Sequence, residues 1–479
     1  MRMSPRAYTL AATALGSSLA FIDATAVLVA LPTIQKALNL GLAGEQWIFL
    51  AYSLALAALY LVGGALGDRW GHRTVFSRGV VGFALASLLA GLAPSGAWLI
   101  AARVLQGISG AFVTTNSLAW LRSVYAEQAG RAVGLWTSLT GISTIIAPPL
   151  GGALTQWLSW RWIFYINLPL AALVVFWTKR AVPDTLDHSQ RRPLDLLGSG
   201  LIALSFGFLT YFLVQGAKIG FAHLLWALVI GLAGLVTFII VERRLSYPLL
   251  PFKLFRVRNF LVANLETLFI YGALNGILVY FTLYLQFLGL TPLSSSLFLV
   301  PVSIVLIALA AYFGGLADRL GPRKLLTAGP VLIGSGALLF SLITTKPMIW
   351  LRGGLGLTFF SLGLAMLVAP ITALALKSVE GRHAGLAAGI NNTVSRLGGL
   401  IAVALVGLII SVSFFSHLPD KHQVPLGLHP PTPAVAAASV HGYQLGMWLV
   451  VGLSYGAALI GWFGVKPLPV AREPKHAAG

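Results

Sequence analysis

Residues 63–73 read GGALGDRWGHR and residues 314–324 read GGLADRLGPRK, so one short phrase occurs twice in the chain. Its two aspartates, Asp68 and Asp318, are 250 residues apart, and each copy directly follows a long apolar run. Two parallel halves of six membrane spans each would repeat after roughly 200 residues. The surplus of roughly 50 residues is the length of two more spans. The phrase therefore predicts an order of six, two and six membrane helices.

The composition supports a membrane protein. The chain has 479 residues, of which 57% are hydrophobic and only 9% are charged, and its mean hydropathy is +0.86. A soluble chain carries about 25% charged residues. The expected fold class is therefore an all-α polytopic membrane protein with 14 transmembrane helices. The apolar runs lie at 8–35, 45–66, 74–93, 97–121, 131–156, 162–180, 195–215, 222–241, 260–289, 294–316, 324–344, 349–376, 384–411 and 441–464.

These runs divide the chain into three predicted parts. An N-terminal six-helix bundle covers residues 1–181, and an inserted pair of helices with flanking cytoplasmic loops covers residues 182–258. A C-terminal six-helix bundle covers residues 259–479 and carries a long external loop near residues 412–440.

The net charge of +19 has a topological explanation. If the N-terminus is cytoplasmic, 24 of the 32 Lys and Arg residues fall on the cytoplasmic side and six fall outside. This bias orients the chain with both termini inside. The basic residues sit in short clusters between apolar runs, so we expect no nucleic-acid partner. The absence of cysteine excludes disulfides and thiolate chemistry.

The repeated phrase combines close packing with charge. Its glycines let two helices approach closely, and Asp68 can cap the next helix and pair with Arg69 or Arg73. We expect the two copies to act as a gating clasp that locks one conformation. The proposed members are Gly64, Asp68, Arg69, Gly71 and Arg73 in the first copy, and Gly314, Asp318, Arg319, Gly321 and Arg323 in the second.

Of the thirteen acidic residues, only Asp23 and Glu266 fall well inside apolar runs. A charge near the middle of a membrane helix is costly and is by default a functional candidate. Asp23 also argues against a cleaved signal peptide, because it interrupts the apolar region where a signal core would be cleanest. Glu266 lies in the run that opens the second half, so internal symmetry predicts matched roles, with both carboxylates facing a central cavity.

The chain resembles the major facilitator superfamily and, more narrowly, its fourteen-span drug:proton antiporters. The resemblance covers nearly the whole chain and includes the repeated phrase, in which His72 replaces the usual Arg or Lys. The most specific match is WRWIFYINLP (160–169), which resembles the start of the sixth span. RVLQGISGAFV (103–113) resembles the fourth-span motif, and the resemblance implicates Arg103 in proton transfer.

Two further motifs carry the resemblance. SLTGISTIIAPPLGGAL (138–154) is similar to the fifth-span antiporter motif, whose packing residues here are Pro148, Gly151 and Gly152. FIDATAVLVALP is similar to the first-span motif, with Leu28 where Asn is usual. Candidate polar residues of the cavity are Gln106, Asn116, Gln286, Asn392 and Arg396, and candidate aromatic ones are Trp120, Trp136, Tyr271 and Tyr280.

These residues predict a mechanism. Burial favours the neutral form of a carboxyl group and a neighbouring guanidinium favours the ionised form, so Asp23 with Arg103 would form a proton switch driven by conformation. The expected function is proton-coupled export of hydrophobic or cationic drugs by alternating access, with the substrate competing for the Asp23 charge. The alternative is a transporter dedicated to one metabolite, in either direction.

Other expectations complete the hypothesis. No catalytic cluster or phosphate-binding loop is recognisable, so we expect no enzyme activity and no cofactor beyond the proton gradient. A receptor that has lost transport would be expected to lose its buried charges. Monomer is the default state, and the resemblance implies the cytoplasmic membrane of a bacterium. The predicted external loop carries several histidines, but their spacing matches no ligand pattern and we expect no metal: His417, His422 and His429, with His441 just beyond.

Overall fold

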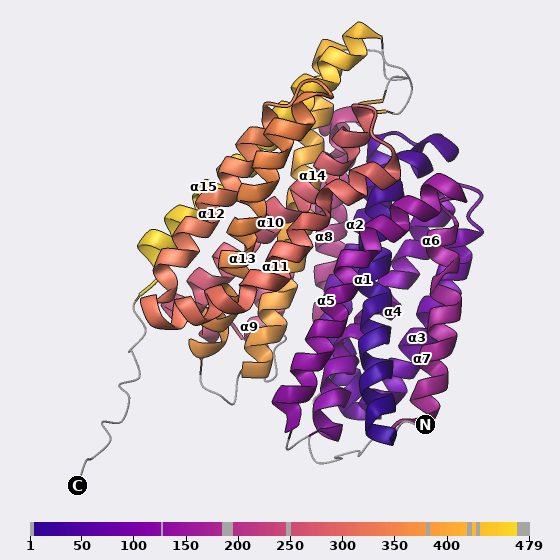
Figure 1. The fold of residues 1–479 in the computed structure, drawn as a ribbon, viewed down its shortest axis with the longest axis vertical. Helices are drawn as coiled ribbons and strands as arrows, with labels where there is room; N and C mark the ends of the chain where they lie inside the picture. The colour runs from indigo at the N-terminus through magenta and orange to yellow at the C-terminus, as the bar shows by residue number, and fades with distance from the viewer. Residues whose placement is uncertain are drawn as a thin grey trace.

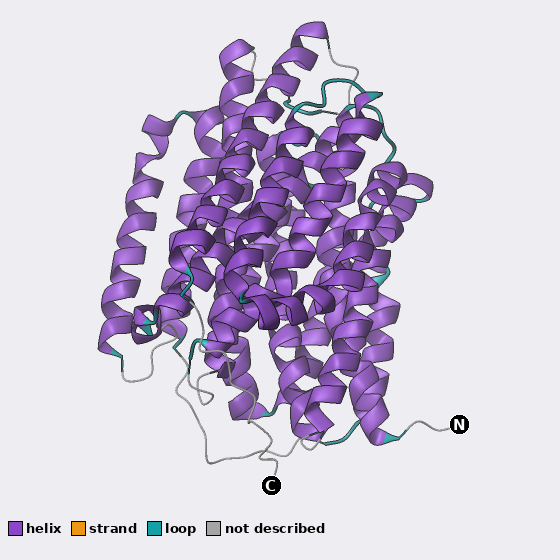
Figure 2. Cartoon of the chain, turned by 60° about the vertical axis from the view of Figure 1, so that its left-hand side comes forward, coloured by secondary structure: helices purple, strands orange, loops and turns teal. Residues whose placement is uncertain are grey.

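The computed structural model describes residues 4–125, 128–183, 195–245, 251–379, 384–418, 424–427 and 432–466. Within these ranges the chain consists of helices and their connections, with no strand (Figure 2). Fourteen helical segments are long and apolar enough to cross a membrane. The predicted all-α class and the predicted number of spans are therefore confirmed.

The first half contains helices α1 to α7. Its spans begin and end within a few residues of the predicted apolar runs. The sixth span is assembled from the short helix α6 followed by α7. The helices are α1 (Pro5–Ala37), α2 (Leu42–Trp70), α3 (His72–Gly91), α4 (Gly96–Val124), α5 (Ala129–Trp157), α6 (Trp162–Tyr165) and α7 (Asn167–Arg180).

The remaining helices form the inserted pair and the second half. The inserted pair is α8 (Leu196–Ile219) and α9 (Leu225–Arg244). The second half contains α10 (Arg258–Phe287), α11 (Pro292–Leu320), α12 (Pro322–Ser341), α13 (Gly354–Lys377), α14 (Ala384–His417) and α15 (Pro433–Gly464), with a π-helical turn at Ile349–Gly353 before α13. The domain limits drawn at residues 181 and 258 stay a prediction.

The internal repeat extends well beyond the quoted phrase. The shift of 250 residues that relates Asp68 to Asp318 also carries the end of α1 onto the end of α10, and both limits of α2 and α3 onto those of α11 and α12. Even the turn after the first helix repeats, since Asn39 and Gly289 both have positive φ, 52° and 91°. The first three helices of each half therefore share one register.

The two halves lie side by side, the first indigo to magenta and the second orange to yellow in Figure 1. They meet along two seams, α5 against α11 and α2 against α14, and α8 packs against both α2 and α14. We call the end of the molecule that carries Asp68 and Asp318 the motif end; the first described residues also lie there. The other end is the opposite end.

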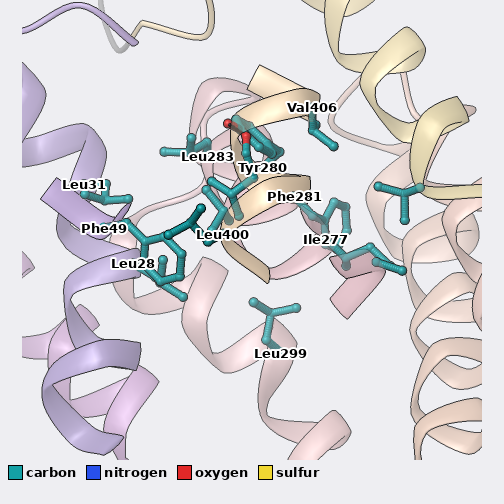
Figure 3. Close-up of a cluster of buried hydrophobic side chains, with 14 of the residues drawn as sticks. Leu28, Leu31, Phe49, Ile277, Tyr280, Phe281, Leu283, Leu299, Leu400 and Val406 are labelled. Carbon is teal, nitrogen blue, oxygen red and sulfur yellow. Dashed lines mark hydrogen bonds between the residues drawn. The ribbon is translucent and has the colours of Figure 1, made fainter. Parts of the chain in front are cut away.

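An apolar cluster joins the halves. Leu28, Leu31 and Phe49 from the first half lie near Leu283 and Leu400 from the second (Figure 3), and all five are buried. Burial of such side chains against one another is ordinarily stabilising inside a protein. Leu28 stands where the family motif has Asn, and here it belongs to this apolar cluster. The cluster separates the motif end from the opposite end.

Candidate functional site

A buried ion pair lies inside the first half. The Asp23 carboxylate on α1 pairs with the Arg103 guanidinium on α4, and both side chains are fully buried. Gln106, one turn further along α4, donates to the second Asp23 oxygen at 3.1 Å and accepts from Arg103 at 2.8 Å. Asn167 on α7 also donates to that Asp23 oxygen, at 3.1 Å. These three contacts to Asp23 all come from donors, an arrangement that suits a carboxylate.

The guanidinium of Arg103 has its own supports. Its Nε donates to the Ile48 carbonyl at 3.1 Å, and its plane lies over the Tyr52 ring at 4.3 Å. The Tyr52 hydroxyl in turn donates to the Ala20 carbonyl at 3.2 Å. One Arg103 nitrogen, Nη2, has no hydrogen-bond partner among the described residues. The pair is therefore held by α1, α2, α4 and α7, but one donor is left free to form another contact.

The sequence interpretation found Asp23, Arg103 and Gln106 but missed three neighbours: Tyr52, Ser87 and Asn167. Ser87 on α3 accepts from Gln106 at 2.7 Å and from Asn167 at 3.2 Å. Asn167 lies in the quoted WRWIFYINLP segment, so an amide residue among the apolar residues at the end of that phrase was a usable signal. Ser87 and Tyr52 carry no comparable signal, because hydroxyl side chains are common in spans.

A cavity of about 860 Å³ lies between the two halves. It extends from Phe49 and Leu400 in the middle of the molecule to Gly64 and Arg122 near the motif end. This volume lies in the range of drug-sized binding sites, about 300–1,000 Å³. Because the apolar cluster closes the far side, the cavity opens toward the motif end.

Neither predicted carboxylate belongs to the wall of this cavity, so the expectation that both face it is wrong. Asp23 turns into the first half, where Arg103, Gln106 and Asn167 surround it. Glu266 turns away from the first half and lies between α10, α12 and α15. Gly461 on α15 packs against both the Glu266 carboxyl and the Leu326 carbonyl. Neither Glu266 oxygen has a hydrogen-bond partner among the described residues.

The register of the repeat explains the error. A shift of 250 residues carries Asp23 onto Ala273, whereas Glu266 corresponds to Gly16. A side chain at Gly16 would collide with the Phe76 ring. In the second half the position that corresponds to Phe76 holds the smaller Leu326, which leaves room for Glu266. Glu266 is therefore two helical turns away from the symmetry mate of Asp23.

Two further carboxylates are buried that the sequence interpretation did not place well inside the spans. Glu45, in the first turn of α2, is 3% exposed, and Glu242, in the last turn of α9, is 1% exposed. Both lie close to helix ends, where hydropathy does not distinguish a buried side chain from a solvated one.

The first copy of the repeated phrase has different partners from those predicted. Asp68 lies 3.4 Å from the Nε2 atom of His72 and caps no helix, since the N-cap of α3 is Gly71 without a side-chain bond. Arg73 instead donates to the Thr178 carbonyl at the end of α7, at 2.8 Å. His72 thus takes the place of the predicted arginines, and it also bonds to Asn116 at 2.9 Å.

In the second copy, Asp318 pairs with Lys377 at the end of α13, at 2.7 Å, and Arg323 lies over the Trp462 ring at 4.5 Å. Among the described residues, the contacts of both aspartates stay within their own half of the molecule. The clasp is therefore open between the halves in this conformation. Its role as a gate stays a prediction.

The two glycines of the fifth-span motif let α5 pack closely against two different helices, α1 and α11. A Cβ atom at Gly151 would lie 2.7 Å from Ala26 of α1, and one at Gly152 would lie 2.8 Å from the backbone of Pro292 and Leu293 on α11. Gly152 therefore permits contact between the halves at the opposite end. Pro148 lies inside α5, as expected.

Polar side chains seal the opposite end as well. Gln286 on α10 donates to the Val29 carbonyl on α1 at 2.8 Å, and Gln46 on α2 donates to the Tyr280 hydroxyl at 2.7 Å. Tyr280 donates onward to the Val403 carbonyl at 2.7 Å. Gln286 and Tyr280, expected in the cavity wall, are thus contacts between the halves instead.

The other predicted cavity residues divide into two groups. Asn392, Arg396, Trp136 and Tyr271 line the cavity. Asn116 does not, because its amide donates to the Gly63 carbonyl at 2.8 Å. Trp120 is buried against Phe76, with ring centroids 5.7 Å apart.

The structure describes two of the four histidines in and beside the predicted external loop, for which we expected no metal. The rings of His417 and His441 lie 5.1 Å apart, whereas His422 and His429 lie outside the described residues. Within the described ranges, no group of three potential metal ligands occurs.

Comparison with known proteins places this architecture in a family. The model of the Major Facilitator Superfamily matches residues 13–403. The chain belongs to this superfamily. It is 35% identical over 411 residues to the multidrug resistance protein Stp of Mycobacterium tuberculosis (strain CDC 1551 / Oshkosh), covering 84% of this chain and 75% of that protein. It is 33% identical over 429 residues to the tetracenomycin C resistance and export protein of Streptomyces glaucescens, covering 86% and 77%.

A solved structure shares the fold. The bacterial homologue of the human lysosomal transporter Spinster, in its inward-facing and unoccupied conformation, superposes with a TM-score of 0.71 at 17% identity, covering 97% of this chain and 98% of that one. The family consists of membrane transporters, so the expectation that this superfamily member is a transporter and not an enzyme is confirmed.

Proposed function

We propose that this superfamily member exports amphipathic toxic compounds in exchange for protons, by alternating access around the central cavity. Its relatives are named for multidrug resistance and for resistance and export, which supports a drug exporter. The observation that carries proton exchange is the buried Asp23–Arg103 pair, because a buried carboxylate with a movable cationic partner can change its protonation with conformation.

The orientation is part of the proposal. The motif end is cytoplasmic, which agrees with the excess of Lys and Arg at that end and with the bacterial relatives. The protein then lies in a cytoplasmic membrane with both termini inside, and its cavity opens to the cytoplasm. A monomer suffices, because residues of both halves of one chain form the cavity.

The proposed cycle places this conformation after release of the proton to the inside, since the partners of Asp23 among the described residues are all hydrogen-bond donors. Opening of the opposite end would separate the halves and rearrange the helices that hold Arg103. Asp23 would lose part of its donor set and accept a proton from outside. Asp23 does not contact the cavity here, so competition between substrate and proton acts through conformation, in place of the shared charge that we expected.

The test is export from cells that produce the protein. A panel of fluorescent and antibiotic amphipaths is screened for reduced accumulation, with and without an uncoupler and in the Asp23→Asn variant. We expect both treatments to abolish export. Asp195→Asn is a matched control, because Asp195 caps α8 outside the ion-pair network and Asn is an equally good cap. Export that is unchanged by the uncoupler, or that persists in the Asp23→Asn variant, contradicts the proposal.

A further inference from the structure

The charges on the cavity wall have one sign. Among the described residues that line it, the charged ones are Arg122 near the mouth and Arg396 deeper in; no aspartate or glutamate is present. The rest of the wall is apolar, aromatic or hydroxyl- and amide-bearing. A cationic substrate would therefore meet two positive charges and no carboxylate.

Arg396 has no counter-charge among the residues that the structure describes. It lies on α14, twelve residues from the start of that helix, which corresponds to about 18 Å along the helix axis. Among the described residues it forms no ion pair and no hydrogen bond, and it lies over the face of the Tyr60 ring, at 5.4 Å. A ring face attracts the positive charge but satisfies none of the five N–H donors of a guanidinium.

An arginine at this depth is costly and is by default a functional residue. Arg396 differs from Arg103, which has a carboxylate, a backbone carbonyl and a glutamine as acceptors. Because Arg396 lines the cavity, its N–H donors are available to a group that arrives with the substrate. Carboxylates fit a guanidinium best, because its planar fork matches their two oxygens.

The surroundings specify the remainder of the ligand. Tyr60, Tyr271 and Trp136 line the cavity and offer aromatic faces, and Asn392, one turn before Arg396 on α14, adds an amide. We propose that the cavity binds amphipathic aromatic anions, with Arg396 as the group that receives the carboxylate. This inference rests on the proposed function and replaces the expected cationic substrate with an anionic one.

Three pyrene compounds test the charge preference: pyrenebutyrate, its neutral amide, and a pyrenebutyl trimethylammonium cation. Binding is measured by equilibrium dialysis against the full chain in lipid nanodiscs, with empty nanodiscs subtracted. We expect the anion to bind at least about tenfold more tightly than the cation. Arg396→Gln should weaken anion binding at least about tenfold and leave amide binding unchanged. Arg396→Lys should retain part of the anion affinity.

The matched control is Arg78→Gln, because Arg78 is exposed on α3 away from the cavity. Unchanged amide binding shows that each variant is folded. Equal affinity for the three compounds, preference for the cation, or equal loss of all three in Arg396→Gln overturns the inference.

Binding needs no proton gradient, so the two proposals fail separately. If the protein binds the anion selectively but its export is insensitive to the uncoupler, the proposed function is overturned and this inference is not. Uncoupler-sensitive export without an anion preference overturns this inference alone.

Discussion

Asp23 and Arg103 form an ion pair that has no exposed side-chain surface and that does not touch the central cavity. The pair therefore cannot be reached by substrate or by bulk water unless the first half rearranges. This separation makes the proton site and the substrate cavity two places that are linked through helix movement.

The first prediction concerns the loss of the Asp23 charge. Removal of one partner of a buried pair costs about 3–5 kcal/mol when the other charge stays buried. We expect Asp23→Asn to lower the thermal unfolding midpoint in detergent and to abolish proton-driven export. Asp23→Asn combined with Arg103→Gln should recover stability without recovering export, because the buried charge is gone but the proton site is also gone. Recovery of export in the double variant would contradict this account.

The second prediction concerns Glu266. Its carboxyl is fully buried and has no hydrogen-bond partner among the described residues. It packs beside Gly461 together with the Leu326 carbonyl, so the negative charge of an ionised carboxylate would have no partner there. We expect Glu266→Gln, a neutral isostere, to export at close to the parental rate with full sensitivity to the uncoupler. A folded Glu266→Gln protein that loses uncoupler-sensitive export would show that Glu266 releases its proton during the cycle.

The third prediction concerns the seal at the opposite end. Gln286 and Gln46 each make a hydrogen bond between the halves, and such a bond contributes about 0.5–1.5 kcal/mol net. Replacement of both by Ala should shift the population toward opening at that end. Because the chain has no cysteine, Ser53→Cys places one thiol in the cavity wall.

Alkylation of that thiol by an impermeant reagent outside intact cells should be faster in the Gln46→Ala, Gln286→Ala background. Gln215→Ala on α8 is the control, since Gln215 makes no hydrogen bond between the halves among the described residues. Equal alkylation rates in parent and double variant would argue against these bonds as a seal.

The fourth prediction concerns Gly152. A larger residue would push α5 away from α11 at the opposite end, and overpacking of this kind costs about 1–3 kcal/mol. We expect Gly152→Val to increase alkylation of the Ser53→Cys thiol from outside and to impair export. Gly134→Val on the same helix is the control, because a Cβ atom there meets nothing within 4 Å. The same phenotype in both variants would exclude a specific role for the α5–α11 contact.

Much of the fold was predictable because hydropathy and the repeated phrase each leave a linear signal. Span limits follow from apolar runs, and the shift of 250 residues between Asp68 and Asp318 carries over to the helix limits. The Asp23–Arg103 pair was predictable through the first- and fourth-span motifs.

The direction of individual side chains was not predictable in the same way. α10 has no distinct polar face, so the sequence did not show that Glu266 points toward α12 and α15 instead of the cavity. The partner of Asp68 was missed because His72 and the arginines are all within reach along the chain, and only packing against Asn116 and Thr178 separates them. The sign of the cavity charge likewise emerged only from the set of side chains that share its wall.

The most direct test of proton exchange is a gradient measurement in proteoliposomes held at zero membrane potential. A pH difference of one unit is imposed, and the steady-state distribution of a substrate found in the export screen is measured. One exchanged proton should sustain a substrate gradient of up to about tenfold in the parent protein, since one pH unit equals 1.36 kcal/mol. Asp23→Asn should sustain none. A parent protein that only equilibrates its substrate, or a folded Asp23→Asn protein that maintains the same gradient, would contradict the account.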